Sequence, residues 1–363
     1  MRFPEFTGEW EKCKLSKVCS FFSGGTPPSS NKEYYNGNIP FIRSGELHND
    51  ETELFITKEG LDNSAAKMVE VGDLLLALYG ATSGDIAISK IKGAINQAIL
   101  CIRTKQNKKF VESVWNKHVA RLLQTYLQGG QGNLSADIVK NIPFYFTNIE
   151  EQNKLARFIS LLDQRIAAQN KIIEDLKKLK SAIRKMIFTS LKNEHTENCE
   201  INQLLAYEQP SEYIVTNDEY SADTTLTPVL TANKGFVLGY TNENFGIYKK
   251  GECIIFDDFT MDAKYVSFPF KVKSSAIKIL TAKPNVNLRF MFEYLSYLEL
   301  KSEEHKRHYI SEIASLIIEL PSKEKQSRIA YLMTSLDNKL VLEENTMARY
   351  MDEKQYILSQ MFI

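Results

Sequence analysis

The chain has 363 residues, of which 43% are hydrophobic and 25% are charged, and its 45 basic and 45 acidic residues give a formal net charge of zero. This composition is typical of a globular protein with real cores and excludes collagen-like, mucin-like and disordered chains, while the length predicts two or three domains. A neutral chain binds nucleic acid only where its charge is segregated along the sequence.

The N-terminal segment MRFPEFTGEWEKCKL has no apolar core of the kind that a secretory signal contains. No apolar run approaches the roughly 18–20 residues of a membrane span. The five cysteines are scattered without C-x-x-C spacing. We therefore expect a cytoplasmic protein with free thiols and no metal site.

Residues 1–149 are predicted to form a globule of short strands and turns with one helix near residues 108–128. Its apolar runs are short and lie between clusters of Gly, Pro and Asn. The run from Ile142 to Phe146 is predicted to be a last buried strand before a long helix.

Residues 150–193 are predicted to form that long helix, which contains neither Pro nor Gly. Its apolar residues recur at alternating steps of four and three from Leu155, which is the stripe of a coiled-coil seam. The stripe is interrupted at Gln169 and Lys180. A helix of this length requires a partner.

Residues 194–323 are predicted to form a second globule, with a helix near residues 287–299 and a last strand from Leu316 to Pro321. Three stretches correspond loosely to the first globule. The pairs are residues 39–44 with 227–232, 72–76 with 251–255, and 97–99 with 275–277.

Residues 324–363 repeat the long helix at a constant offset of 174 residues. The identities are Glu150/Glu324, Gln152/Gln326, Ala156/Ala330, Leu162/Leu336, Asp163/Asp337, Lys180/Lys354, Ile183/Ile357 and Phe188/Phe362. The seam is interrupted at the same two places, Gln169/Glu343 and Lys180/Lys354. This shared pattern indicates duplication. We expect the helices to pack antiparallel, with Leu155 close to Ile357.

The charge is segregated: residues 150–193 carry a net charge of +5, and residues 194–323 a net charge of −6. The sequence lacks a P-loop, a G-x-S-x-G elbow, an H-E-x-x-H motif and the Asn-Pro-Pro or Asp-Pro-Pro motif typical of amino-methyltransferases. We therefore expect a chain that does not catalyse a reaction by itself.

Several short motifs occur together in a specific order. They are W-E-x-x-x-L near the start, Gly24-Gly25-Thr26-Pro27, Ile39-Pro40-Phe41-Ile42, Gly72-Asp73-Leu74-Leu75, Gly132-Asn133-Leu134-Ser135, and Pro143 with Glu151-Gln152 at the head of the helix. Their order, together with the duplication, resembles the specificity (S) subunits of type I restriction-modification enzymes.

The resemblance implies an α+β fold with pseudo-two-fold symmetry. Two target-recognition domains, residues 1–149 and 194–323, would be separated by two long helices in an antiparallel coiled coil, and each would read half of a bipartite DNA site. It also implies methyltransferase (M) subunits, two in number, and restriction (R) subunits as partners. S-adenosylmethionine, ATP and Mg are expected on those partners and no cofactor in this chain.

Candidate DNA contacts are polar residues in loops that follow apolar strands. Arginine suits the two acceptors of guanine, and Gln or Asn suits adenine. In the first globule the candidates are Arg43, Ser44, Tyr79, Thr82, Ser83, Gln128, Gln131 and Asn133. In the second they are Thr231, Asn233, Lys234, Lys249, Lys250, Lys264, Lys306 and Arg307. The same polar residues could instead cap turns. Asp257 and Asp258 could accept from cytosine or cap a turn.

Two other functions are compatible with the sequence. The chain could serve a methyltransferase without any restriction subunit, or it could be a coiled-coil scaffold whose globules bind proteins.

Overall fold

A computed structural model describes residues 2–126, 134–194, 196–232, 235–300 and 312–362. The chain forms two compact units, which are treated separately below. Unit 1 comprises residues 1–170 and 345–363, and unit 2 comprises residues 171–344. Each unit therefore contains one globule and a part of both long helices.

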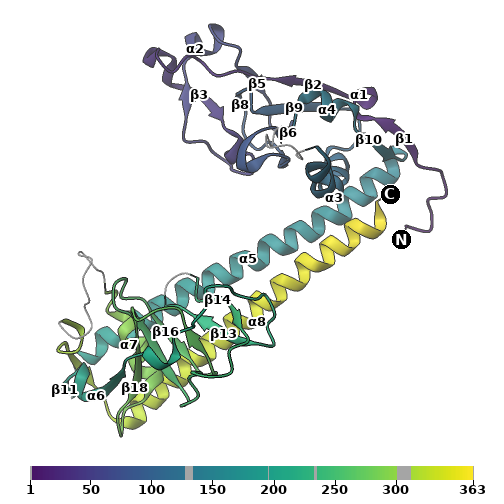
Figure 1. The fold of residues 1–363 in the computed structure, drawn as a ribbon. Helices are drawn as coiled ribbons and strands as arrows, with labels where there is room; N and C mark the ends of the chain where they lie inside the picture. Colours follow the sequence, from purple (N-terminus) through teal and green to yellow (C-terminus); the bar gives the residue numbers. More distant parts are fainter. Residues whose placement is uncertain (1, 127–133, 195, 233–234, 301–311, 363) are drawn as a thin grey trace. The chain divides into compact units, whose positions relative to one another are not determined.

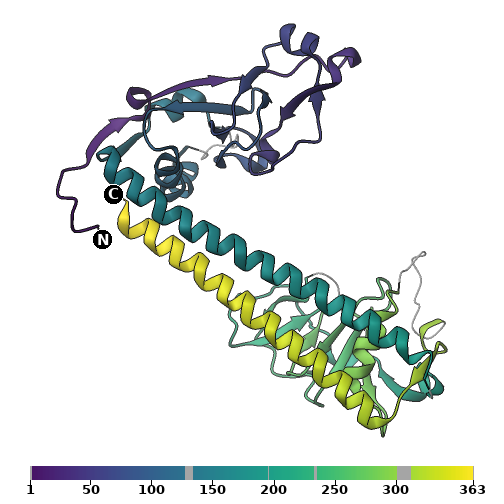
Figure 2. The ribbon, with the colours of Figure 1, turned by 180° about the vertical axis from the view of Figure 1, so that it is seen from behind.

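The two long helices are α5 (Ile149–Leu191) and α8 (Lys323–Met361), close to the predicted ranges. Figures 1 and 2 show them side by side from opposite directions. In unit 1, Leu155 and Ile357 belong to the same apolar cluster, so the predicted antiparallel packing is confirmed. Among the described residues, no helix has the length and apolar character needed to cross a membrane.

One of the two polar interruptions shared by both helices, Lys180/Lys354, is an ion pair across the seam. In unit 1, Lys354 Nζ lies 2.6 Å from Asp163 Oδ1. In unit 2, the equivalent Lys180 pairs with Asp337. Charged groups at seam positions fix the register of paired helices at some cost in stability. The repeated interruption is therefore explained by two reciprocal contacts.

Each of these aspartates also binds a cation from its own globule. In unit 1, Lys109 Nζ is 2.7 Å from Asp163 Oδ2, and in unit 2 Arg289 pairs with Asp337. Burial alone would raise the pKa of Asp163, but Lys109 and Lys354 hold that pKa below its usual value. The same carboxylate thus connects the two long helices and the globule.

The described residues of unit 1 form three sheets. A two-stranded antiparallel sheet pairs β1 (Glu11–Lys14) with β10 (Pro143–Phe146). A four-stranded sheet has the order β2 (Cys19–Ser23), β9 (Ile99–Thr104), β6 (Leu74–Ala77) and β7 (Ile86–Ile88). Another has the order β4 (Phe55–Ile56), β3 (Tyr35–Ile42), β8 (Gly93–Ile95) and β5 (Lys67–Val69). Its helices are α1 (Leu15–Val18), α2 (Lys58–Asp62), α3 (Lys108–Tyr126) and α4 (Ala136–Asn141), with short 3-10 turns η1 (Lys32–Tyr34), η2 (Ser44–Glu46) and η3 (Gly80–Thr82).

Unit 2 repeats this arrangement. Its two-stranded sheet pairs β11 (Glu197–Glu200) with β19 (Ile317–Leu320). Its four-stranded sheet has the order β12 (Leu205–Glu208), β18 (Ile277–Ala282), β15 (Cys253–Asp257) and β16 (Ala263–Val266). Its three-stranded sheet has the order β14 (Val237–Thr241), β13 (Thr227–Leu230) and β17 (Lys271–Val272). Its further helices are α6 (Ile201–Leu204), α7 (Leu288–Tyr297) and the 3-10 turn η4 (Ser211–Tyr213).

The loose sequence correspondences between the globules are confirmed by the strand order. Strand β3 pairs in parallel with β8, and β13 pairs in parallel with β17. Strands β6 and β15 each lie between their equivalents of β9 and β7. The globules are two versions of one α+β fold, and the expected fold class is correct.

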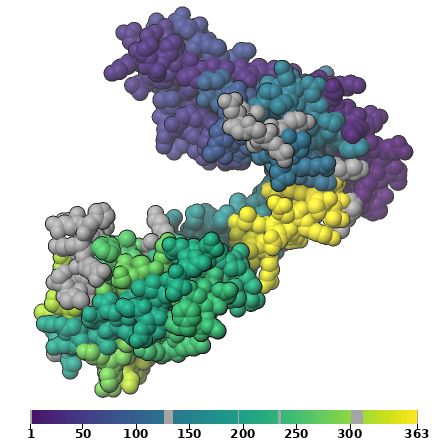
Figure 3. Space-filling model, in the orientation of Figure 1, coloured from purple at the N-terminus to yellow at the C-terminus, as the bar shows by residue number. Residues whose placement is uncertain are grey.

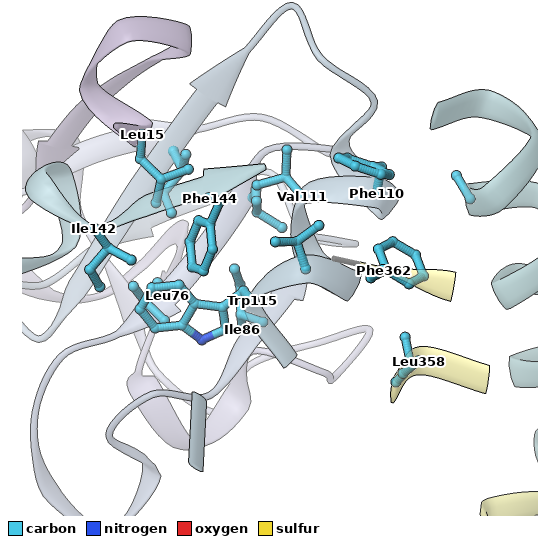
Figure 4. Packing of buried hydrophobic residues seen from close by; sticks show 14 of the residues in the cluster. Leu15, Leu76, Ile86, Phe110, Val111, Trp115, Ile142, Phe144, Leu358 and Phe362 are labelled. Atoms are coloured by element: carbon cyan, nitrogen blue, oxygen red, sulfur yellow. The ribbon is translucent and has the colours of Figure 1, made fainter. Parts of the chain in front are cut away.

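The end of each long helix is built into a globule. In unit 1, the ring of Phe362 lies 5.4 Å from that of Phe110 on α3, and Figure 4 shows Phe362 and Leu358 turned toward the cluster around Phe110 and Val111. In the space-filling view the yellow end of α8 lies directly against this globule (Figure 3). In unit 2 the equivalent Phe188 is fully buried, so the duplicated phenylalanine performs the same packing twice.

A duplicated glutamine attaches each globule to the start of a long helix. In unit 1, the Asn107 N–H donates to Gln152 Oε1 (3.1 Å), and Gln152 Nε2 donates to the Thr147 carbonyl (2.7 Å). In unit 2, the Asn287 N–H donates to Gln326 Oε1 (2.9 Å). Asn107 and Asn287 stand immediately before α3 and α7, so each glutamine holds the start of the helix that packs on the seam.

Candidate nucleic-acid interface

Two candidate loops of unit 1 lie on the same edge of the globule. Turn η2 follows β3, and η3 follows β6 after two residues. His48, which follows η2, places its Nε2 at 2.9 and 3.0 Å from the two carboxylate oxygens of Asp85, which follows η3. This contact brings the loop of Arg43 and Ser44 next to the loop of Tyr79, Thr82 and Ser83, so five of the predicted contact residues lie in adjacent loops.

Arg43 is held by two carboxylates. Its Nη2 lies 2.8 Å from Glu46 Oε1 and 2.7 Å from Glu53 Oε2, and its Nε donates to Glu46 Oε2 at 3.1 Å. Burial alone would raise the pKa of Glu46, but hydrogen bonds from Arg43, from the Glu53 backbone and from Thr52 hold it at about 2. Arg43 therefore shapes the loop. The predicted guanine contact would use Nη1, or would require release from the exposed Glu53.

The Tyr79 loop has a specific backbone conformation that is held by hydrogen bonds. Gly80 and Gly84 have φ values of +78° and +87°, which side-chain-bearing residues rarely adopt. The Ser83 hydroxyl donates to the Leu78 carbonyl (3.0 Å), and the buried Trp115 donates from Nε1 to the Gly84 carbonyl (2.8 Å). The Ser83 hydroxyl is thus used within the loop, whereas Tyr79 is 38% exposed.

The candidates Gln128, Gln131 and Asn133 lie outside the described residues. Leu134, which follows them, is fully buried and donates its N–H to the Leu78 carbonyl (2.9 Å). The chain therefore re-enters the described structure beside Tyr79.

His48 was missed by the sequence reasoning. It is a lone histidine in a loop, and only the folded chain reveals its contact with Asp85. The hydrogen bond to Asp85 raises the pKa of His48. Its side chain is 63% exposed, so it adds a titratable group to the edge formed by η2 and η3.

In unit 2 the described candidates have different surroundings. Lys249 is exposed. Lys250 is exposed too, but its Nζ pairs with Glu208 (2.7 Å) and lies over the ring of Tyr213. Lys264 is half-buried in β16, and Thr231 is only 8% exposed, which disfavours direct contact by its side chain. The other candidates, Asn233, Lys234, Lys306 and Arg307, lie outside the described residues.

The alternatives for Asp257 are resolved in favour of a turn. Its Oδ1 accepts from the backbone N–H groups of Phe259 and Thr260, both at 2.9 Å. Asp258 is buried at 3.5 Å from the equally buried Lys278. Within the described ranges, no group of three His, Cys, Asp or Glu residues is arranged to hold a metal ion.

Comparison with known proteins identifies one family for both halves. The family model for the "Type I restriction modification DNA specificity domain" matches residues 7–178 and again residues 193–349. The two matches cover most of the chain, and each includes one globule.

Individual relatives agree with the model. The chain is 39% identical over 172 residues to the type I restriction enzyme EcoR124I/EcoR124II specificity subunit of Escherichia coli, an alignment that covers 43% of this chain and only 41% of that protein. It is 23% identical over 368 residues to the MjaIX specificity subunit of Methanocaldococcus jannaschii, covering 92% and 83% of the two chains.

The fold matches solved structures along its whole length. One is the S subunit of a type I restriction-modification system from M. genitalium, with a TM-score of 0.63 at 14% identity, covering 98% of this chain and 96% of that one. A second, from a study of complex assembly in a type I system, gives a TM-score of 0.58 at 14% identity over 97% of both chains. At this identity the likeness concerns the fold alone.

Proposed function

This chain belongs to the family of type I restriction-modification DNA specificity domains, and we propose on that premise that it is the subunit that recognises DNA sequence in such a system. Its two globules each read one half of a bipartite site. In this proposal the chain recognises the DNA sequence, and partner subunits carry out methylation and cleavage.

The observation that carries the proposal is the duplicated fold with unlike surfaces. The sheets, the long helices and the glutamine attachments repeat. The loops after the strands do not repeat. Tyr79 directly precedes η3 in unit 1, whereas in the equivalent turn of unit 2 Asp257 accepts hydrogen bonds from the backbone. A duplicated frame with diverged loops is suited to reading two different short sequences.

Direct readout requires side chains that reach base edges, and phosphate contacts fix the register. In unit 1 we assign this role to the edge formed by η2 and η3, with Tyr79, Ser44 and Thr82 nearest to the bases. The neighbouring His48 serves as a phosphate contact when protonated. In unit 2 we assign the role to Lys249, which is exposed, whereas Lys264 is half-buried and Lys250 pairs with Glu208.

The partners follow from the absent catalytic motifs. We propose two methyltransferase subunits and, where restriction occurs, restriction subunits. S-adenosylmethionine, ATP and Mg would be bound by those subunits, and the assembly would act in the cytoplasm.

The experiment that tests this proposal is capture of DNA. The purified complex of this chain with its methyltransferase subunits is incubated with random double-stranded fragments, and the retained fragments are sequenced. The expected result is one motif with two defined halves and an undefined spacer. Retention without any motif, or no retention at moderate salt, would favour the scaffold alternative.

A further inference from the structure

The turn that follows β15 in unit 2 has the same backbone frame as the turn that follows β6 in unit 1. The Ala77 N–H donates to the Asp85 carbonyl, and the Asp257 N–H donates to the Asp262 carbonyl, each at 2.8 Å. Each bond closes the turn at the end of the central strand of its four-stranded sheet. The two turns are therefore structural equivalents, although the turn of unit 2 is shorter.

The first residue of each turn also has an equivalent place. The Leu78 N–H donates to the Ala98 carbonyl (2.8 Å), and the Asp258 N–H donates to the Ala276 carbonyl (2.9 Å). Leu78 belongs to the main apolar cluster of unit 1. Asp258 is just as well buried, at 1% exposure. A buried carboxylate thus stands in unit 2 where unit 1 has a leucine.

A second exchange lies next to the first. The register of β6 with β9 and that of β15 with β18 place Leu100 and Lys278 at equivalent positions. The Lys278 side chain is 1% exposed, and its Nζ lies 3.5 Å from Asp258 Oδ2. The same Nζ donates to Gln209 Oε1 at 3.0 Å. Two buried leucines of unit 1 therefore correspond to a buried ion pair of unit 2.

Stability alone does not account for this ion pair. Two charges lose their hydration when they are buried, and replacing such a pair by apolar side chains of similar size is often neutral or stabilising. A buried ion pair does restrict geometry, because its partners are satisfied in few arrangements. Lys278 on β18 joins Asp258 in the turn to Gln209, which directly follows β12. The ion pair thus ties the turn to two strands of the sheet.

Unit 1 holds its turn from a different element. Trp115 on α3 donates from Nε1 to the Gly84 carbonyl in the turn, at 2.8 Å. Counted from the asparagine that caps each helix, Leu295 of α7 is the equivalent of Trp115. Leu295 is buried but has no polar group in its side chain. Unit 2 therefore lacks the indole anchor, and its turn is held by Lys278 instead.

The turn of unit 2 presents its tip, not its base, to the surface. Thr260 is exposed and Phe259 is half-buried. Their backbone N–H groups both bind Asp257 Oδ1. Asp258 is too deeply buried to reach a base edge, so its effect on DNA must pass through the tip.

We propose that Asp258 and Lys278 are positioning residues, which hold the turn of residues 257–262 in the conformation that reads one half of the DNA site. Neither side chain touches DNA. The ion pair fixes the direction in which Thr260 is presented. This inference rests on the proposed function, because the turn reads DNA only if the globule of unit 2 does.

The test imports the residues of unit 1 into unit 2. Asp258→Leu with Lys278→Leu removes both charges together, and circular dichroism verifies the fold. The variant chain, in complex with its methyltransferase subunits, selects fragments from a random duplex pool. The expected motif keeps the half read by unit 1 and loses defined bases in the other half. Binding to the wild-type motif should weaken by about 5- to 150-fold, the range for one mismatched base pair.

A matched control removes another buried charge pair from the same globule. Lys271 is fully buried and pairs with Glu243 at 2.6 Å, on the three-stranded sheet instead of beneath the turn. Lys271→Met with Glu243→Gln should leave both halves of the motif intact. A role of buried ion pairs in stability alone predicts that the two pair variants behave alike.

A reciprocal variant tests the anchor of unit 1. Trp115→Phe keeps most of the ring but removes the donor to Gly84. It should loosen the half of the motif read by unit 1 and leave the half read by unit 2 unchanged. A second pair variant, Asp258→Asn with Lys278→Met, is closer to the native side chains in size. It should give the same motif as the leucine pair.

Either of two outcomes would overturn the inference. One is a complete motif selected by both pair variants at wild-type affinity. The other is loss of both halves in both pair variants, which would assign the ion pair to the fold as a whole. A wild-type complex that selects no two-part motif would refute the proposed function itself, so the two failures are distinguishable.

Discussion

Replacing Gln152 with Ala should detach the start of α3 from the long helix. The side chain is fully buried, and its removal leaves the Asn107 N–H without its acceptor and the Thr147 carbonyl without its donor. Each group left unsatisfied costs about 1–3 kcal/mol, so the variant should lose about 2–6 kcal/mol of local stability.

Hydrogen exchange measures this loss at the affected group. The amide of Asn107 should exchange about 5- to 150-fold faster in Gln152→Ala, which corresponds to roughly 1–3 kcal/mol, while that of Asn287 is unchanged. Gln326→Ala should give the reverse pattern. Gln152→Met keeps most of the volume, so it should expose Asn107 equally with a smaller loss of global stability.

Unchanged protection of Asn107 in Gln152→Ala would refute the attachment. Equal acceleration at Asn107 and Asn287 would also contradict it, because the two glutamines act in separate units.

Three further predictions concern the seam, the spacer and pH. Asp163→Asn and Lys354→Met should couple by about 1 kcal/mol in a double-mutant cycle of urea unfolding, and additive effects would show that the ion pair contributes nothing. Inserting one heptad between Glu174 and Lys180, with a matching heptad in α8, lengthens the helix pair by about 10 Å. If the helices set the distance between the half-sites, methylation mapping should find a spacer longer by about 1–3 base pairs. An active complex with an unchanged spacer would show that the helices do not set this distance. The pKa of Glu46 in the folded chain is lowered from its ordinary 4.5 to about 2. The ionised carboxylate therefore stabilises the fold above pH 4.5, and this contribution is lost as the pH falls toward 2. Glu46→Gln should make the free energy of unfolding less dependent on pH in this range, and an unaltered pH dependence would contradict the prediction.

The helices and the duplication could be predicted because they depend on local periodicity. The seam from Leu155 and its copy predicted both the ranges and the antiparallel pairing, and the shared interruption at Lys180 and Lys354 already marked a position under a common constraint. The nature of that constraint could be learned only from the fold, because Asp163 and Lys354 are 191 positions apart in the sequence.

The loops were less predictable because the hydrogen-bond partners of a polar residue depend on which segments the fold brings close to it. Arg43 was predicted to face DNA, yet Glu46 three residues later and Glu53 engage it; the i,i+3 spacing to Glu46 was a signal that sequence reasoning could have used. Thr231 was chosen for following an apolar strand, but the chain buries it. The antiparallel pairing of β1 with β10 joins segments about 130 residues apart, and no local sequence pattern predicts this pairing.

The central claim is that each globule reads one half of the DNA site. The direct measurement is to replace residues 1–149 with the first globule of a family member that recognises a different sequence, and to map methylated sites in cells that carry the hybrid with its partner subunits. The predicted result is a motif with one half replaced and the other half retained. A motif in which both halves change, or in which neither changes while the hybrid is active, would contradict the division of recognition between the two globules.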